Sequence, residues 1–208
     1  MTGAPGPSGP ERLPRLTPDR LDDEQRQVYD AIAGGPRAAG PQAFPLIDED
    51  GSLNGPFGVM LHAPSVGAPL QDLGSAIRYR TQLSGRVREI AILQVAVATG
   101  SRFEWWAHER VGRQVGLTDL ELTWLANGAA LELADPGEQA AHDFVAAVLR
   151  RPGIPAQDYS RAEAELGRRT LVELAVLIGY YRLLAETMHV FAVGLPGEAE
   201  PTHSHSHG

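Results

Sequence analysis

The sequence predicts an all-α protein. Its long segments carry apolar side chains at the three- and four-residue spacing of amphipathic helices. Glycine-containing breaks at residues 99–100 and 127–128 separate these segments, and Ser-x-x-Glu at 101–104 and Thr-x-x-Glu at 118–121 are typical helix starts. These signals together indicate a bundle of helices joined by short connections.

In chain order, the expected helices cover residues 18–33, 65–82, two runs on either side of the break at 99–100 within 83–116, then 118–126, 136–150, 159–167 and 169–193. Pro18 opens the first of these helices, because proline is favoured at the first helical position. Arg78 and Arg80 lie near the end of the second, where they complement the helix dipole. Leu70, Leu73, Ile77 and Tyr79 are expected to face inward there. Residues 36–64 have no clear periodicity, and His142 is expected to be solvated.

Length and composition indicate one domain. The 208 residues are 43% hydrophobic, which supports a sizeable core over residues 18–196. Residues 1–17 are rich in proline and glycine and are expected to be disordered or loosely draped over the fold. Residues 197–208 form a flexible tail that contains three histidines, which could hold a transition metal only weakly.

Charge and hydropathy restrict the partners. A formal net charge of −8 disfavours nucleic acid and anionic membranes as partners. No segment approaches the roughly 18 apolar residues of a membrane span, and the first residues lack the apolar core of a secretory signal. A cytoplasmic protein with a small-molecule substrate is therefore expected.

The segment 83–116 holds the densest chemistry. Glu89 falls on the apolar face of its first helix, while Arg88 and Gln94 point elsewhere, and Glu104 and His108 share one face of the second. In an antiparallel hairpin, Glu89 would lie roughly 16 Å before the turn and His108 roughly 12 Å after it, so the two are nearly level. Two carboxylates and one imidazole can then converge on one apolar cavity, which is typical of an acid–base site.

Each of these residues also has a structural interpretation. Glu104 could serve only as the partner of Ser101 in a helix cap. Glu89 could pair with Arg86, one turn earlier, and His108 could be a core histidine bonded to a carbonyl. The combination on facing stripes, rather than any single residue, favours a site.

The residues of this hairpin resemble a known family. Arg-x-Arg-Glu-Ile-Ala-Ile-Leu at 86–93, Glu-Trp-x-x-His at 104–108 and Gly-Leu-Thr at 116–118 are similar to the carboxymuconolactone decarboxylase family and its relatives, the alkylhydroperoxidase D proteins. The resemblance covers roughly residues 55–196. It implies a multihelical alkylhydroperoxidase D-like bundle, in which Glu89 stands at the proton-relay glutamate, His108 at the active-site histidine and Glu104 at an acidic position of decarboxylase-like members.

The sequence departs from the peroxidase branch of that resemblance. The C-x-x-C pair of that branch falls on Ser101 and Glu104, and the chain contains no cysteine. Because no other side chain carries the thiol–disulfide couple, a thiol peroxidase is excluded.

These observations predict a cofactor-free acid–base enzyme that acts on a small carboxylated lactone or enone, by decarboxylation or proton-transfer isomerisation. His108 would donate a proton, Glu89 would be a relay with a pKa raised by burial, and Glu104 would orient His108 or share its proton. The alternatives are a non-catalytic binding or scaffold protein and a metal-dependent lyase. We expect no cofactor, because phosphate-binding glycine loops and a pyridoxal-phosphate lysine motif are absent from the sequence. We also expect no bound metal, since zinc normally needs three protein ligands.

Three further residues are predicted to bind the substrate. Arg86 is the arginine expected near the site, and Phe57 belongs to an apolar Gly-Pro-Phe segment that would cover the cavity mouth. His62 would either line the pocket or bond to backbone, and we favour the bond.

Two features concern duplication and assembly. The string Glu-Leu-Ala-Val-Leu at 173–177 echoes Glu-Ile-Ala-Ile-Leu at 89–93, which an internal duplication would explain, although Glu173 is expected to pair with Arg169. Trp105 and Trp106 cannot both face inward on one helix, so we expect a homo-oligomer, as a dimer, trimer or hexamer.

Overall fold

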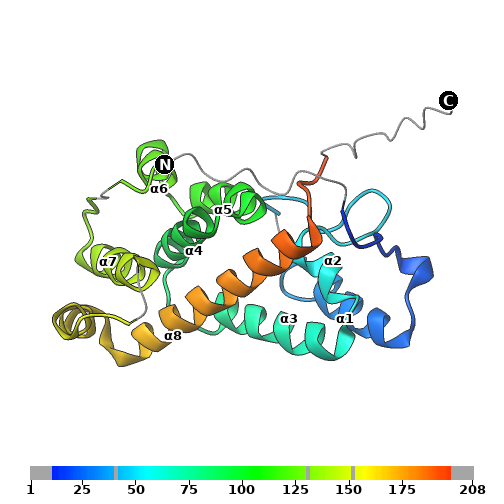
Figure 1. Cartoon of the computed structure of the whole chain (residues 1–208), viewed down its shortest axis with the longest axis horizontal. Coiled ribbons are helices and arrows are strands. Elements are labelled where there is room, and N and C mark those ends of the chain that lie inside the picture. Colours follow the sequence, from blue (N-terminus) through cyan, green and yellow to red (C-terminus); the bar gives the residue numbers. More distant parts are fainter. Residues whose placement is uncertain (1–10, 40–41, 130–131, 151–152, 198–208) are drawn as a thin grey trace.

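The computed structural model describes residues 11–39, 42–129, 132–150 and 153–197, and within these residues it contains eight α-helices and no β-strand (Figure 1). The helices are α1 (Asp23–Ala33), α2 (Pro56–Met60), α3 (Pro64–Tyr79), α4 (Gly85–Thr99), α5 (Arg102–Gln114), α6 (Asp119–Ala126), α7 (Pro136–Arg150) and α8 (Ala156–Phe191). The predicted all-α class is confirmed.

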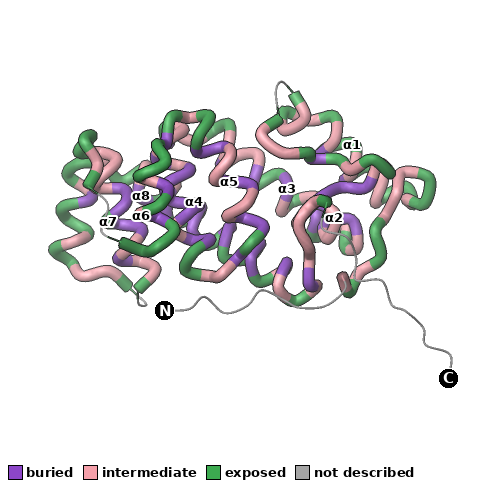
Figure 2. Tube along the Cα trace, turned by 90° about the horizontal axis from the view of Figure 1, so that it is seen from above, coloured by how far each residue is buried: buried purple, intermediate pink, exposed green. Residues whose placement is uncertain are grey.

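Helix α4 lies among α5, α6, α7 and α8 and contacts all four. Its sequence is apolar on nearly every side, which is typical of a helix surrounded by others. Eight of its residues are buried (Figure 2): Val87, Glu89, Ile90, Ala91, Ile92, Leu93, Val95 and Ala96. The carboxylate of Glu89 is therefore carried into the core by the helix itself.

The antiparallel pairing of α4 and α5 is as predicted. Gly100 ends α4 in a left-handed conformation, with φ of 68°, which glycine adopts without strain. Ser101 then caps α5 by accepting a hydrogen bond from the backbone N–H of Glu104. The tight turn places the inner faces of the two helices against each other.

Helix α8 covers a segment in which two separate helices were expected. Helix α8 contains one non-helical residue, Gly167, with φ of 75° and ψ of 157°, so the predicted helices 159–167 and 169–193 are its two arms. The first helix was expected to begin at Pro18. Instead, Pro18–Arg20 is a short 3₁₀ turn, and α1 starts after Asp22, which forms a reciprocal capping box with Gln25.

The inner face of α3 agrees with the prediction in part. Ile77 is buried and Leu70 packs against the core, as predicted, but Leu73 and Tyr79 are exposed, and Gly67, Gln71 and Gly74 are buried in addition. The glycines explain this: a β-carbon on Gly67 would lie 2.2 Å from the carbonyl oxygen of Met60. Close approach of neighbouring chain, rather than bulky side chains, therefore determines which face of α3 points inward.

Two other sequence-based expectations need correction. The side chain of Arg15 bonds Ser52 Oγ and Asn54 Oδ1, both at 3.0 Å, so the described part of the 1–17 segment is anchored to the fold. His142, expected to be solvated, is buried at 8% exposure because α7 turns it towards the core. Residues 1–10 and the histidine-containing tail from 198 lie outside the described residues.

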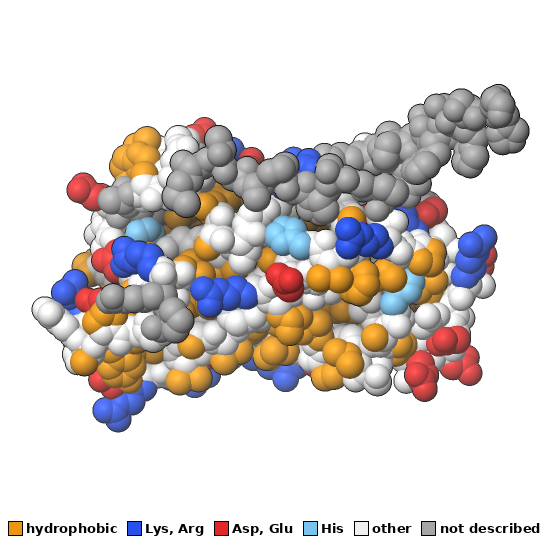
Figure 3. Space-filling model, viewed as in Figure 1, with side chains coloured by type: hydrophobic (Ala, Val, Ile, Leu, Met, Phe, Trp, Pro, Cys, Tyr) orange, Lys and Arg blue, Asp and Glu red, His pale blue; other side chains and the backbone are white. Residues whose placement is uncertain are grey.

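The surface of α8 carries an exposed apolar stripe. Val172, Val176, Leu183 and Val190 are all exposed, and at 100° per residue they lie within about 40° of one line along the helix. Hydrophobic side chains are seen on this face of the molecule (Figure 3). Within the described ranges, no helix combines the length and apolar character that a membrane crossing requires.

Candidate active site

Glu89 of α4 and His108 of α5 meet between the two helices. Nδ1 of His108 lies 2.6 Å from Oε2 of Glu89. Glu89 is completely buried, and the side chain of His108 is 8% exposed. The predicted convergence of this carboxylate and imidazole is present, and water can reach it only from the histidine side.

Glu104, one turn before His108, completes the arrangement. Its Oε2 lies 3.3 Å from Nε2 of the imidazole, so His108 is held between two carboxylates. Its other oxygen, Oε1, is buried and has no hydrogen-bond partner. Glu104 was expected either to cap its helix or to take part in a site. Its carboxylate faces His108, which agrees with the second role, and its other oxygen is available to another molecule.

Two arginines stand behind Glu89. Nε of Arg88 lies 3.4 Å and Nη1 of Arg78 lies 3.8 Å from Oε1 of Glu89. Arg88 was expected to point away, but its long side chain folds back to the carboxylate next to it and also donates to the carbonyl of Arg78. Both guanidinium groups add positive charge beside the buried carboxylate.

These charges determine the protonation of the pair. Burial raises the pKa of Glu89, but His108, Arg78 and Arg88 lower it by more, so the pKa lies below its usual value. The raised pKa expected from burial alone is therefore wrong. Burial lowers the pKa of His108, whereas Glu89 and Glu104 raise it by more, to about 9. At neutral pH the site holds an imidazolium beside an ionised Glu89.

A cavity of about 230 Å³ opens beside this pair. Glu104 and His108 line it, whereas the fully buried Glu89 lies behind them. Phe57 and Phe103 provide apolar wall, and Tyr181 packs edge-on to the imidazole with ring centroids 5.1 Å apart. The cavity is smaller than the roughly 300–1,000 Å³ of pockets for drug-sized ligands, so it fits a small molecule.

The structure separates the three residues predicted to bind substrate. Phe57 lies on the cavity wall, as expected. His62 lies away from it, with Nε2 3.0 Å from the carbonyl oxygen of Pro14, which agrees with the favoured structural interpretation.

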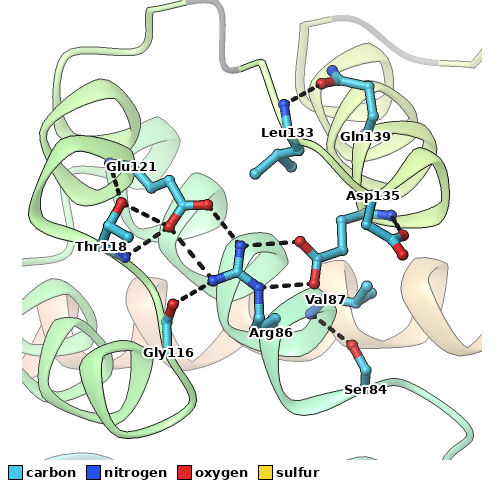
Figure 4. A network of polar contacts seen from close by, with 10 residues as sticks. Ser84, Arg86, Val87, Gly116, Thr118, Glu121, Leu133, Asp135 and Gln139 are labelled. Carbon is cyan, nitrogen blue, oxygen red and sulfur yellow. Dashed lines mark hydrogen bonds and ion pairs between the residues drawn. The ribbon is translucent and has the colours of Figure 1, made fainter.

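Arg86 was assigned wrongly. It turns away from Glu89 and bonds Glu138 at 2.8 and 3.0 Å and Glu121 at 2.6 Å (Figure 4). These glutamates lie in the first turns of α6 and α7, and together they attract the guanidinium out of the hairpin. Arg86 ties α4 to both helices and does not line the cavity.

Sequence reasoning missed other residues of the cavity. Arg37, from the irregular connection between α1 and α2, and Tyr180, from α8, both line it. Tyr180 lies in the expected helix 169–193, but helical periodicity does not indicate that its side chain reaches a cavity. Nothing in the local pattern around Arg37 indicates that it reaches the site.

Comparison with known proteins supports the resemblance. The model of the carboxymuconolactone decarboxylase family matches residues 64–147, the segment that contains Glu89, Glu104 and His108. The match covers helices α3 to α6 and most of α7. A search of curated proteins found no match.

Solved structures share the fold. A peroxidase-related protein with an alkylhydroperoxidase AhpD core from Ralstonia eutropha JMP134 is 16% identical, with a TM-score of 0.70 over 92% of this chain and 95% of that one. A peroxidase-related protein from Silicibacter sp. TM1040 is 17% identical, with a TM-score of 0.65 over 90% and 93%. The debrominase Bmp8 is 10% identical, with a TM-score of 0.65 over 88% and 91%. The alkylhydroperoxidase D-like fold is therefore confirmed.

Metal binding was also considered. Across the described ranges, no group of three or more His, Cys, Asp or Glu side chains has an arrangement suited to a metal ion. In the candidate site, the imidazole nitrogens of His108 both face carboxylates. That arrangement suits a protonated ring.

Proposed function

We propose that this chain is a cofactor-independent acid–base enzyme that acts on a small carboxylated lactone or enone. The observation that carries the proposal is the row Glu89–His108–Glu104, which ends in a residue of the cavity lining whose buried oxygen Oε1 has no hydrogen-bond partner. In such a row the outer carboxylate can exchange a proton with a substrate, while the imidazolium beside it holds a compensating positive charge.

The geometry supports a distinct role for each side chain. Glu104 is the group that exchanges a proton with the substrate, because its Oε1 is unpaired and it lines the cavity. His108, as an imidazolium, can donate its Nε2 proton to Glu104 and take it back in a later step. Glu89 does not reach the cavity and is a positioning residue that keeps His108 oriented and protonated.

Two reactions fit these roles. In an isomerisation, Glu104 removes a proton next to the carbonyl group, the electron pair is delocalised onto the carbonyl oxygen, and the proton returns to a different carbon. In a decarboxylation, the carbon–carbon bond to the carboxylate breaks, its electron pair forms an enolate, and carbon dioxide leaves. The enolate carbon then takes one proton from the Glu104–His108 pair, which regains it from water.

The structural neighbours do not narrow the reaction. One of them is called a debrominase and others peroxidase-related, but this chain has no cysteine with which to perform thiol redox chemistry. Acid–base chemistry needs only the side chains that the cavity contains.

The test is a panel of small lactone and enone acids incubated with the protein in D₂O without added cofactor. Carbon dioxide release and deuterium incorporation at carbon are the readouts. We expect Glu104→Gln and His108→Ala to reduce turnover by at least about 10²-fold, the typical contribution of general acid–base catalysis. Glu173→Gln, which alters a glutamate bound to Arg169 on α8, should have normal turnover.

Two outcomes would reject the proposal. Full turnover by both site variants would place the chemistry elsewhere. A protein that binds members of the panel but converts none of them would be the non-catalytic alternative, and activity that disappears on treatment with a chelator would identify the metal-dependent one.

A further inference from the structure

The cavity contains two hydrogen-bond donors that the fold leaves without partners. Nε of Arg37 and the hydroxyl of Tyr180 are both buried and bond to nothing in the described chain. Tyr180 is 4% exposed, so water cannot readily serve it. Because buried polar groups in native proteins are nearly always paired, two orphan donors on one cavity indicate a site for an acceptor.

Gly74 shows that these donors lie close together. A β-carbon built on Gly74 would lie 2.1 Å from the hydroxyl oxygen of Tyr180 and 2.6 Å from Nη2 of Arg37. The connection after α1 and the middle of α8 therefore bring their polar ends to the same point on α3. Glycine at this position leaves the space that both groups occupy.

The chemistry of the two groups selects an anion. Burial raises the pKa of Tyr180 to about 12, so its hydroxyl remains protonated and can donate. The guanidinium of Arg37 lies over the Phe57 ring, 5.0 Å from its centre, which favours its position at the cavity wall. A planar cation beside a neutral donor suits a carboxylate, whose two oxygens can each accept a hydrogen bond.

We propose that Arg37 and Tyr180 form the carboxylate-binding subsite of this cavity, and that the carboxylate held there stays on the product. The claim that the carboxylate stays on the product rests on the proposed function. Hydrogen bonds and positive charge stabilise a bound carboxylate in the ground state, and loss of carbon dioxide would have to give up that stabilisation. The carboxylate held by Arg37 is the anchor, and the reacting carbons lie at Glu104 and His108.

This assignment narrows the substrate class. A substrate with one carboxylate undergoes proton-transfer isomerisation, because its only carboxylate is the anchor. A substrate that is decarboxylated carries a second carboxylate near Glu104. In either case the product is still an acid, and it competes with the substrate for the same subsite.

The experiment is direct binding, measured by titration calorimetry with trans-cinnamate and sorbate and with their neutral amides. The wild-type protein should bind each acid at least about 10-fold more tightly than its amide. Arg37→Gln should abolish that preference by weakening acid binding about 10-fold or more, and Tyr180→Phe should weaken it about 5-fold. Arg113→Gln, which alters an arginine paired with Glu109 and Asp119, should bind like the wild type.

Gly74→Ala supplies an independent variant. It removes no charge and no donor, yet its methyl group displaces the ends of Arg37 and Tyr180, so it should also lose the preference for the acid. Circular dichroism would verify that each variant is folded.

Glu104→Gln separates this proposal from the proposed function. It should lose turnover but keep the preference for acids. Arg37→Gln that binds acids like the wild type, or wild-type protein that binds neither acid or prefers the amides, would overturn the subsite even if turnover is found. Tight acid binding without turnover would leave the subsite standing and remove the proposed function.

Discussion

Oε2 of Glu89 lies 2.6 Å from Nδ1 of His108, and the glutamate is completely buried. An apolar helix face carries this carboxylate into the core, where an imidazolium and two arginines neutralise it. The protein thus keeps a charge pair in its core, where ionisable side chains are rarely buried unless they are paired. Several measurable consequences follow from this pair and from the contacts around it.

Removal of the Glu89 charge should destabilise the fold. Glu89→Gln leaves His108, Arg78 and Arg88 without their shared counter-charge, and we expect the free energy of unfolding to fall by about 3 kcal/mol, as for other broken buried pairs. Urea denaturation measures this. Glu163→Gln is the matched control, because its partner Arg168 is largely exposed and the loss should be much smaller. Equal losses in the two variants would contradict the account.

Stability should also depend on pH in a defined direction. The folded state keeps the proton of His108 up to about pH 9, whereas the unfolded chain loses it near 6.5. The contribution of His108 is therefore full below about pH 6.5 and is lost as the pH rises to about 9. Glu89, with its lowered pKa, contributes above its unfolded pKa of about 4.5 and loses that contribution as the pH falls.

Unfolding free energies at a series of pH values test this directly. The decline above pH 6.5 should approach about 1.4 kcal/mol per pH unit, the limit for one proton. It should be absent in His108→Asn and present in His142→Gln, which alters a different buried histidine. An unchanged decline in His108→Asn would assign it to another group.

Arg86 should matter for stability and not for binding. It bonds Glu121 and Glu138 and so joins the starts of α6 and α7 to α4. Arg86→Gln should lower the free energy of unfolding by about 2 kcal/mol, since the lost hydrogen bonds involve charged groups. The affinity for carboxylate probes should not change. Loss of affinity with normal stability would restore Arg86 as a substrate ligand.

Self-association should use the exposed stripe of α8. Trp105 and Trp106, which first suggested an oligomer, pack against two different apolar clusters of their own chain. The exposed stripe of α8, which consists of Val172, Val176, Leu183 and Val190, is the better candidate for the contact between chains. A row of large apolar side chains is unusual on a helix surface that faces water. Light scattering should give more than one chain per particle, and Leu183→Glu should lower the mass. Leu120→Glu, at an exposed position on α6, is the control, and a monomeric wild type would contradict the prediction.

The fold and the centre of the site could be predicted because both are encoded locally. Apolar periodicity and capping residues determine the helices. Because the turn at Gly100 is tight, the rise per residue in each helix determines how far Glu89 and His108 lie from the turn, and it places them opposite each other. Convergence within one hairpin needs no knowledge of the remaining chain.

The remainder depends on distant contacts. The prediction that Arg86 binds substrate was wrong because helical periodicity gives only the side of α4 on which it lies. It does not include the glutamates of α6 and α7, 35 and 52 residues away, to which its side chain bonds. The pKa of Glu89 was expected to rise because only burial was considered, and the opposing effects of His108, Arg78 and Arg88 were not. Arg37 was missed because the path of an irregular connection is determined by the surface on which it packs.

The most direct test of the central claim is a pH titration of His108 by imidazole nitrogen NMR. We predict a protonated ring at pH 7 with a pKa of about 9 in the wild-type protein, and a clearly lower pKa in Glu89→Gln. A wild-type pKa at or below the ordinary value of about 6.5 would show that the buried charge pair does not exist. The proposed proton transfer would then lose its physical basis.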